Sequence, residues 1–217
     1  MHLSQPDRKR SSKRPVVCVL AARMGSQRLP GKVLKVLPNG RTVFGTVLDA
    51  CRQATTIDQI ALVTTGRSED HDLLRLAILE NLPAFTGTEH DLLRVFREAA
   101  EDQKAQTVVR VTCDCPLLQP TTIDEVVQEF LKSDVDFAYN SRLDVGDGQD
   151  VEVMTIEALR KADQETKDPE DRSHVTPYLR TGPFTRLWVP PPPGVYRSLN
   201  TPSDWHWITQ VYYGRTQ

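Results

Sequence analysis

A short stretch of glycines and cations, residues 21–32, contains the residue types that bind phosphate. Gly25 and Gly31 let the backbone turn sharply and bring its amides close to an anion. Arg23, Arg28 and Lys32 add positive charge over the same span. The apolar run at residues 16–20 just before it is short and rich in valine, which predicts a buried strand. The loop is therefore expected to leave the end of a core strand.

This loop matches neither of the common nucleotide fingerprints. It lacks the G-x-x-x-x-G-K-[ST] pattern of P-loop proteins and the G-x-G-x-x-G pattern of dinucleotide-binding enzymes. An ordinary strand-to-helix connection with a solvated basic face is the simpler interpretation of glycines and basic residues alone. The residue types by themselves leave both interpretations open.

Three acidic residues are candidates because of the strands next to them. Asp114 follows a strand predicted at residues 107–112, and ligand crevices in open α/β sheets lie at the carboxyl ends of strands. Asp150 and Glu152 alternate with apolar residues, so both carboxylates are expected on one face of a strand. The ordinary alternatives are a turn that Asp114 begins and two solvated acids on a surface strand.

The order of predicted elements indicates an α/β fold. Strands alternate with amphipathic helices, which favours a mostly parallel sheet with covering helices. Helices are predicted at residues 42–54 and 69–80, from Asp91, and around Ile156 and Leu159; strands are predicted at 16–20, 60–64, 107–112, 135–139, 150–154, 184–189 and 195–199.

Two helix starts are predicted from capping residues. Thr122 and Glu125 form a capping box before the apolar stripe of Ile123 to Leu131. Thr201 caps the last helix, and Pro202 takes its first helical position.

Length and charge restrict the class of protein. The chain has 217 residues, of which 39% are hydrophobic, so residues 16–217 are expected to form a single domain with one sizeable core. A formal net charge of -2 gives no overall attraction to nucleic acid or to an anionic membrane. No apolar run approaches the ~20 residues that cross a bilayer. We therefore expect a soluble cytoplasmic protein without a nucleic-acid or membrane partner.

Residues 1–15 are expected to form a disordered basic tail. They contain several lysines and arginines among polar residues and no apolar core of a signal peptide. A nucleic-acid-binding or lipid-binding arm is the alternative. The four cysteines, Cys18, Cys51, Cys113 and Cys115, are expected to be buried free thiols, because a metal site at Cys113 and Cys115 would need two further ligands.

Taken with these features, the chain resembles the sugar cytidylyltransferases, and especially the spore-coat-polysaccharide type related to the CMP-Kdo and CMP-sialate synthetases. The family carries A-R-x-x-S-x-R-x-P-x-K after its first strand, which Ala22, Arg23, Ser26, Arg28, Pro30 and Lys32 match in register. The resemblance covers roughly residues 16–204 and includes further segments at residues 87–94, 110–117, 148–153, 172–178 and 200–204. It implies a Rossmann-like α/β/α sandwich with a mixed, mostly parallel sheet, of the nucleotidyltransferase or GT-A-like type.

The resemblance also implies roles for residues of the nucleotide site. The loop residues Ala22, Arg23, Met24, Gly25 and Ser26 would cradle the nucleotide, with Gly87 and Arg94 as secondary candidates. Arg28 and Lys32 would stabilise charge on departing pyrophosphate. Asp114 would hold the Mg²⁺ ion that bridges the phosphates, although Cys113 replaces the usual glycine before it.

On the acceptor side, the resemblance implies four residues. Asp150 and Glu152 would line this side, and Arg172 and His174 would grip an acidic group of the acceptor. Ser173 departs from the family, which has glutamate there. In the wider group this segment reaches across to a second subunit, so a dimerisation arm and a homodimer with shared acceptor pockets are implied.

The main departure from the family is Asn200, because the aspartate usual at this position is a magnesium ligand in relatives. Asparagine offers one neutral carbonyl oxygen, so the metal is expected to bind less tightly without nucleotide. Three outcomes stay open: metal held mainly by Asp114 and the triphosphate, an inward turn of Asp204, or reduced activity.

The implied activity moves CMP from CTP to an acidic acceptor and releases pyrophosphate. A sugar acid, a polyol phosphate or a phosphonate would each suit a basic pocket. One alternative is another nucleotide on the same fold, as in a uridylyl- or guanylyltransferase or a glycosyltransferase, but Cys113-Asp114-Cys115 lacks the Asp-x-Asp motif of the latter. The other alternative is a nucleotide-binding protein that has lost catalysis, which the replacement of the usual aspartate by Asn200 would indicate.

Overall fold

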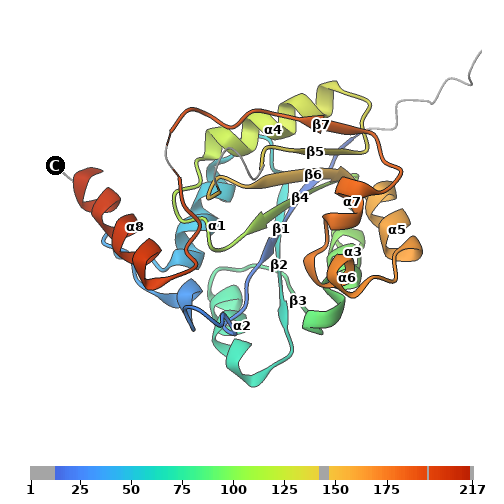
Figure 1. Cartoon of the computed structure of the whole chain (residues 1–217). Helices are drawn as coiled ribbons and strands as arrows, with labels where there is room; N and C mark the ends of the chain where they lie inside the picture. The colour runs from blue at the N-terminus through green and yellow to red at the C-terminus, as the bar shows by residue number, and fades with distance from the viewer. Residues whose placement is uncertain (1–12, 142–146, 195, 216–217) are drawn as a thin grey trace, which may run out of the picture.

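A seven-stranded mixed sheet lies at the centre of the computed structural model, which describes residues 13–141, 147–194 and 196–215 (Figure 1). Strand β6 runs antiparallel to both of its neighbours, β4 and β5, while the other paired strands are parallel. The expected mixed, mostly parallel sheet is therefore confirmed. Its order is β3 (Ala84–Gly87), β2 (Gln59–Thr65), β1 (Val16–Ala21), β4 (Thr107–Thr112), β6 (Val151–Thr155), β5 (Phe137–Tyr139) and β7 (Arg186–Trp188).

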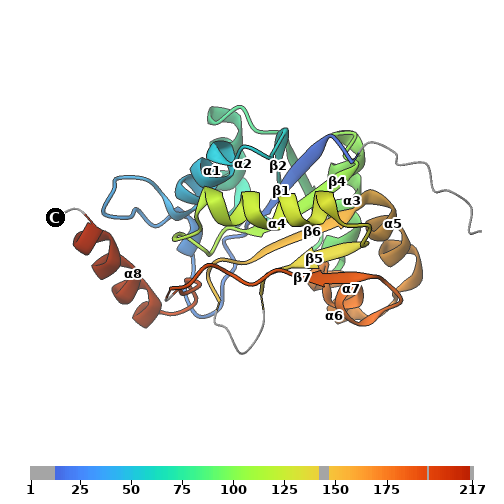
Figure 2. The same cartoon turned by 90° about the horizontal axis from the view of Figure 1, so that it is seen from above.

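Helices cover both faces of the sheet, as the two views together show (Figure 2). Residues 16–20 of β1 are fully buried, because helices pack on both sides of this central strand. One apolar cluster joins the sheet to α1 (Val43–Gln53), α2 (His71–Leu79) and α4 (Pro120–Lys132). The other joins it to α3 (Leu92–Asp102), α5 (Ile156–Glu165) and α7 (Pro177–Thr181). The α/β/α sandwich is thus confirmed.

One predicted cap is wrong. Helix α4 begins at Pro120, whose fixed φ suits the first helical position, rather than after Thr122. Thr122 consequently lies inside the helix, where its buried hydroxyl donates to Oε1 of Gln149 at 2.8 Å. The cap predicted for α8 (Pro202–Arg215) is confirmed, because the Asp204 amide donates to Oγ1 of Thr201 and the Asp204 carboxylate accepts from the Thr201 amide.

The strand predicted at residues 195–199 is also wrong, since residues 196–199 belong to no strand and Val195 lies outside the described residues. The backbone of this segment makes one close contact with the sheet edge: the Leu199 amide donates to the Asp114 carbonyl at 2.6 Å. That contact brings Asn200 next to the end of β4.

Part of the expected tail and the segment expected to form an arm both pack on the body of the chain. Residues 1–12 of the tail lie outside the described residues, but residues 13–15 are held against the body, with Lys13 Nζ donating to the Phe130 carbonyl at 3.1 Å. The segment expected to form an arm contains α6 (Pro169–His174) and α7, which pack on α3 and α5 of the same chain. Within the described ranges, no helix has the length and apolar character needed to span a bilayer.

Gly87 gives a test of the packing between β3 and α3. A Cβ at this position would lie 2.1 Å from Cγ2 of the buried Val95. We expect Gly87→Ala to lower the free energy of unfolding by about 1–3 kcal/mol, because the inserted methyl forces Val95 and its neighbours to move. Urea unfolding measures this difference.

The matched control for this prediction is Gly66→Ala, since a Cβ there meets no atom within 4 Å. This control is expected to change stability by less than about 1 kcal/mol. Equal effects of the two substitutions would contradict the packing argument.

Candidate functional site

A cleft of about 720 Å³ opens at the carboxyl ends of β1, β2 and β4. Its walls come from the loop after β1, from η3 (Glu89–Asp91), from α6 and from Asn200. The residues predicted for the site that line it are Ala22, Arg23, Ser26, Arg28, Lys32, Asp114, His174 and Asn200. Ala22 and Asn200, which are 178 residues apart in sequence, therefore both lie at the sheet edge where ligand crevices are expected.

The other predicted site residues are not part of the cleft lining. These are Met24, Gly25, Gly87, Arg94, Asp150, Glu152 and Arg172.

The glycine loop is held by a buried aspartate that the sequence analysis missed. Asp70 is fully buried, and its Oδ1 accepts the Met24 amide at 2.7 Å while its other oxygen accepts the Thr65 hydroxyl. The Met24 carbonyl in turn accepts the amides of Ser26 and Gly31 at 2.8 and 3.1 Å. Met24 thus anchors the loop. An aspartate at the start of a helix gives no sequence signal for this role, because a helix cap explains it equally well.

Lys32 connects the two residues predicted to hold the metal. Its ammonium donates to Oδ2 of Asp114 at 2.9 Å and to Oδ1 of Asn200 at 3.1 Å, and its side chain is only 11% exposed. Burial alone would raise the pKa of Asp114, but the Lys32 ammonium outweighs burial and holds that pKa below its ordinary value. Asp114 is therefore a carboxylate at neutral pH.

These oxygens fit a hard cation that also binds phosphate. Because both contact one ammonium, the Asp114 and Asn200 oxygens converge on a single point. Mg²⁺ commonly takes one or two protein oxygens and completes its octahedron with phosphate and water. In the described part of the chain, no group of three or more His, Cys, Asp or Glu side chains is arranged to hold a metal without such help.

Glu152 is buried in an ion-pair cluster. Its carboxylate is 3% exposed and accepts from Nη1 of Arg110 and Nη2 of Arg180, both at 2.5 Å. The Thr176 hydroxyl donates to it at 3.1 Å. Burial would raise the pKa of Glu152, but the two arginines hold it below its ordinary value. Of these residues, Arg110 lines the cleft.

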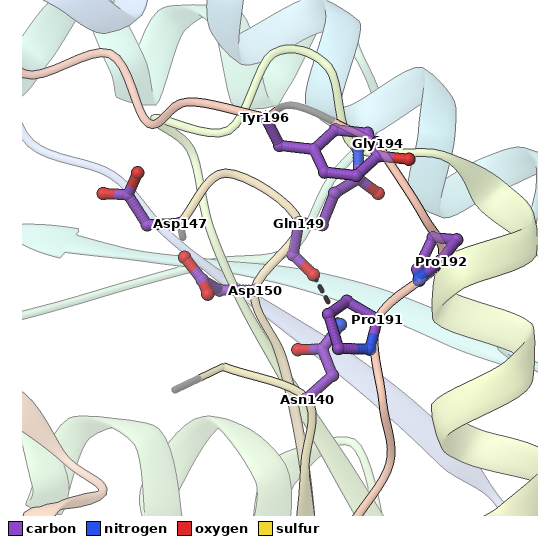
Figure 3. A pocket seen from close by; sticks show the side chains of 8 residues that line it. All are labelled: Asn140, Asp147, Gln149, Asp150, Pro191, Pro192, Gly194 and Tyr196. Carbon is purple, nitrogen blue, oxygen red and sulfur yellow. Dashed lines mark hydrogen bonds between the residues drawn. The ribbon is translucent and has the colours of Figure 1, made fainter. Parts of the chain in front are cut away.

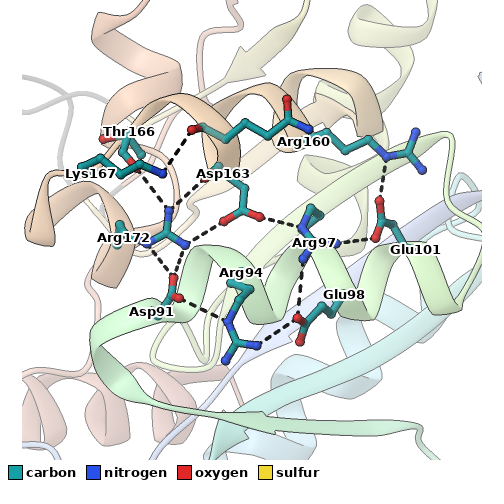
Figure 4. Close-up of polar contacts among 11 residues, drawn as sticks. Asp91, Arg94, Arg97, Glu98, Glu101, Arg160, Asp163, Thr166, Lys167 and Arg172 are labelled. Atoms are coloured by element: carbon teal, nitrogen blue, oxygen red, sulfur yellow. Dashed lines mark hydrogen bonds and ion pairs between the residues drawn. The ribbon is translucent and has the colours of Figure 1, made fainter.

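Arg172 belongs to a network of ion pairs behind the cleft wall (Figure 4). Its guanidinium contacts Asp91 at 2.5 Å and Asp163 at 2.7 Å, which ties α6 to η3 and α5. Arg94 lies in the same network, where it pairs with Asp91 and Glu98. In this arrangement neither arginine lines the cavity, and Arg172 fixes the position of the cleft wall formed by α6.

The end of α6 is shaped by an unusual backbone conformation. Val175 follows His174 with φ of 75°, a region that β-branched residues rarely adopt, and its side chain is fully buried. Burial of this valine holds the turn after α6, and Ser173 and His174 at that end line the cleft.

Asp150 lies beside a second, small pocket of about 20 Å³ (Figure 3). Burial raises the pKa of Asp150 to about 6, and the negative charges of Asp147, Glu152 and Asp114 add to the effect. The Cys115 thiol lies between the two sites, 3.8 Å from Oδ1 of Asp114 and 3.9 Å from Oδ2 of Asp150.

The four cysteines are buried free thiols, as expected. Burial raises the pKa of Cys113 and Cys115 well above the ordinary value of a thiol. Both thiols therefore stay protonated, and a thiolate metal site is not favoured.

A mostly parallel α/β sheet with a cation-lined cleft at its carboxyl edge is the architecture of nucleotide-binding enzymes. Residues 17–197 match the family model described as Cytidylyltransferase. The chain belongs to the cytidylyltransferase family and is an enzyme of the nucleotidyltransferase class. The family expected from the motifs is thus confirmed.

Individual relatives agree with this assignment. The chain is 32% identical to the uncharacterized protein MJ1063 of Methanocaldococcus jannaschii, over 82% of this chain and 72% of the relative. It is 28% identical to the spore coat polysaccharide biosynthesis protein SpsF of Bacillus subtilis, over 77% and 71%. A solved cytidylyltransferase structure from Leptospira borgpetersenii has a TM-score of 0.84 at 27% identity and covers 91% of this chain and 87% of that one.

Asp150 predicts a pH dependence of stability. Its pKa of about 6 in the folded protein exceeds the unfolded value of about 3.9, so the folded state holds the extra proton and loses stability as pH rises from about 4 to 6. Asp150→Asn removes this loss. We expect the stability of Asp150→Asn relative to wild type to increase by about 1–3 kcal/mol as the pH rises from 4 to 7.5, measured by urea unfolding at both pH values. A difference that does not change with pH would contradict the assignment.

Proposed function

We propose that this cytidylyltransferase moves CMP from CTP to a hydroxyl of a small acidic acceptor, with Mg²⁺ as cofactor. The observation that carries the proposal is the contact of Lys32 with both Asp114 and Asn200 in a cleft lined by Arg23 and Arg28. A triphosphate brings about four negative charges, and this end of the cleft supplies the cations and the carboxylate that a metal-bound triphosphate needs.

In the proposed reaction, an acceptor oxygen attacks the α-phosphorus of CTP. The new oxygen–phosphorus bond forms as the bond to the bridging oxygen breaks, pyrophosphate leaves with the electron pair, and the proton of the acceptor hydroxyl passes to solvent. Catalysis of such a transfer is mostly positioning and neutralisation of charge. Lys32 and Arg28, which line the cleft, would stabilise charge on the leaving group, and the loop anchored at Met24 would orient the nucleotide.

Asp114 and Asn200 are the residues that would hold Mg²⁺. When bound, the ion neutralises phosphate charge and orients the phosphate oxygens. Asn200 carries no charge, so the protein supplies one carboxylate here, and the nucleotide would provide the remaining anionic ligands.

The acidic nature of the acceptor is supported by a cation beyond the loop, Arg110, which lines the cleft from β4. The His174 imidazole lines the cleft from α6 and can hydrogen-bond an acid group. A sugar acid, a polyol phosphate or a phosphonate would suit them, and a role in polysaccharide biosynthesis would match the name of the Bacillus subtilis relative. A homodimer is part of the same proposal.

Nucleotide titration tests this function. CTP, UTP, GTP and ATP are titrated into the protein by calorimetry, each with and without Mg²⁺. We expect magnesium-dependent preference for CTP, followed by pyrophosphate release with an acidic acceptor. Preference for another nucleotide would indicate the uridylyl- or guanylyltransferase alternative. Tight CTP binding without any turnover over a panel of acids would favour a non-catalytic nucleotide-binding protein, for which Asn200 is the motivating residue.

Two substitutions test the proposed roles of Lys32 and Asp114. Lys32→Ala and Asp114→Asn are expected to lower turnover by about 100-fold or more, because each removes a charge that faces the phosphates. Arg94→Ala is the control, since Arg94 pairs with Asp91 and Glu98 outside the cleft lining, and its turnover is expected to stay within about threefold of wild type. Near-normal turnover of the first two folded variants would overturn the proposed roles.

Asn200→Asp tests how the metal is held. A carboxylate at this position adds negative charge about 3 Å from the Lys32 ammonium and beside Asp114. We expect the nucleotide-free variant to bind Mn²⁺ or Mg²⁺ about tenfold more tightly than wild type, measured by calorimetry or by electron paramagnetic resonance of free Mn²⁺. Asn200→Ala is the control and is expected to give no gain. Unchanged metal affinity in Asn200→Asp would show that this position does not contact the ion.

A further inference from the structure

The positive charges of the cleft fall into two groups on different elements. Arg23, Arg28 and Lys32 come from the loop after β1, which is the part that we propose for the triphosphate. The second is Arg110 on β4. It belongs to a different element from the loop proposed for the triphosphate, so its partner is sought in the other substrate.

Arg110 is fixed by its neighbour across the sheet. It lies directly opposite Glu152 in the antiparallel pair of β4 and β6, and its Nη1 donates to Oε2 of Glu152 at 2.5 Å. Two residues further along β4, Thr112 also lines the cleft, and Asp114 follows the end of the strand. Arg110 therefore lies on the strand that leads to the metal-binding end of the site, with its guanidinium held in one orientation.

The buried cluster around Glu152 leaves an excess of positive charge. One carboxylate lies between the guanidiniums of Arg110 and Arg180, so the three groups together carry one net positive charge. The hydroxyl of Thr176 adds a donor and no charge. On the cleft wall, Glu89 pairs with Arg23 and Arg67. The charge of Asp150 interacts with that of Glu152, but Asp150 does not line the cleft. An anion that enters the cleft beside Arg110 would therefore meet the positive charge of its guanidinium.

The two arginines of the cluster differ in how many hydrogen bonds their guanidiniums make. The Arg180 guanidinium donates to the hydroxyl and the carbonyl of Ser141 as well as to Glu152, and it lies 4.5 Å above the ring of Tyr139. Arg110 makes only the bond to Glu152 among the described residues. Its Nε is buried without a partner and out of reach of a ligand, but its second terminal nitrogen, Nη2, is not among the buried unpaired atoms, so its donors are available to a ligand in the cleft.

We propose that Arg110, oriented by Glu152, binds the acid group of the acceptor. A planar guanidinium suits the two oxygens of a carboxylate, phosphate or phosphonate, and its fixed position would place the acceptor between α6 and the phosphates of CTP. Glu152 acts as the positioning residue. This inference rests on the proposed function and extends it, because it assigns the selection for an acidic acceptor to one residue on β4.

The matched pair Arg110→Gln and Arg180→Gln tests the inference. Each substitution removes one arginine from Glu152 and changes the charge equally, but Arg110 lines the cleft and Arg180 is not among the lining residues. Each protein is first saturated with Mg²⁺ and the α,β-methylene analogue of CTP. Calorimetric titrations then compare gluconate with sorbitol and glycerol 3-phosphate with glycerol, so that each acid has a neutral counterpart.

The wild-type protein is expected to bind at least one acid about tenfold more tightly than its neutral counterpart. Arg110→Gln is expected to weaken binding of that acid about 10- to 100-fold and to abolish the preference, as loss of charged hydrogen bonds predicts. Arg180→Gln is expected to keep the preference, and affinity for the CTP analogue is expected to stay within about threefold in both variants.

Equal weakening of acid binding in the two variants would overturn the inference, because it would show that Arg110 acts only through the cluster. Retained preference in Arg110→Gln, or no preference in a wild-type protein that binds the CTP analogue, would overturn it as well. Should Arg110→Gln not fold, Arg110→Lys keeps a cation, and an intermediate loss of acid binding is then expected. Failure of the wild-type protein to bind the CTP analogue would instead contradict the proposed function itself.

Discussion

The ammonium of Lys32, held between Asp114 and Asn200, is the interaction on which the site depends. It joins three segments that are distant in sequence: the glycine loop, the end of β4 and the start of α8. The same contact keeps Asp114 ionised although burial opposes its charge. The group that would hold a metal ion is therefore ready before any nucleotide arrives.

Carboxylates position the remaining walls of the cleft. The buried Asp70 fixes the Met24 amide, the buried Glu152 fixes Arg110, and the partly buried Asp163 accepts from Arg172 behind α6. Each lies where an unpaired charge would be expensive, so each holds its partner in a narrow range of positions. In this chain, several residues that shape the site therefore lie behind the surface that substrates would touch.

Arg172 illustrates the difference between a motif and a contact. The motif around residues 172–178 resembles a family segment, and an arginine beside a histidine suggested a grip on an anion. In the structure His174 lines the cleft, whereas Arg172 is bound to Asp91 and Asp163. Neighbours in sequence at the end of a six-residue helix point in different directions, and no property of the sequence states which one faces the cavity.

The sequence by itself determined the α/β class, the central strands and the loop that lines the cleft, because hydrophobic periodicity and glycine spacing are local properties. It also determined the start of α8 through Thr201 and Asp204. Only the tertiary structure decided that α4 starts at Pro120, that residues 196–199 form no strand, and that Asp70 and Arg110 belong to the site. These depend on which distant groups share a hydrogen bond or a buried charge, and such pairing is fixed only when the sheet brings the ends of its strands together.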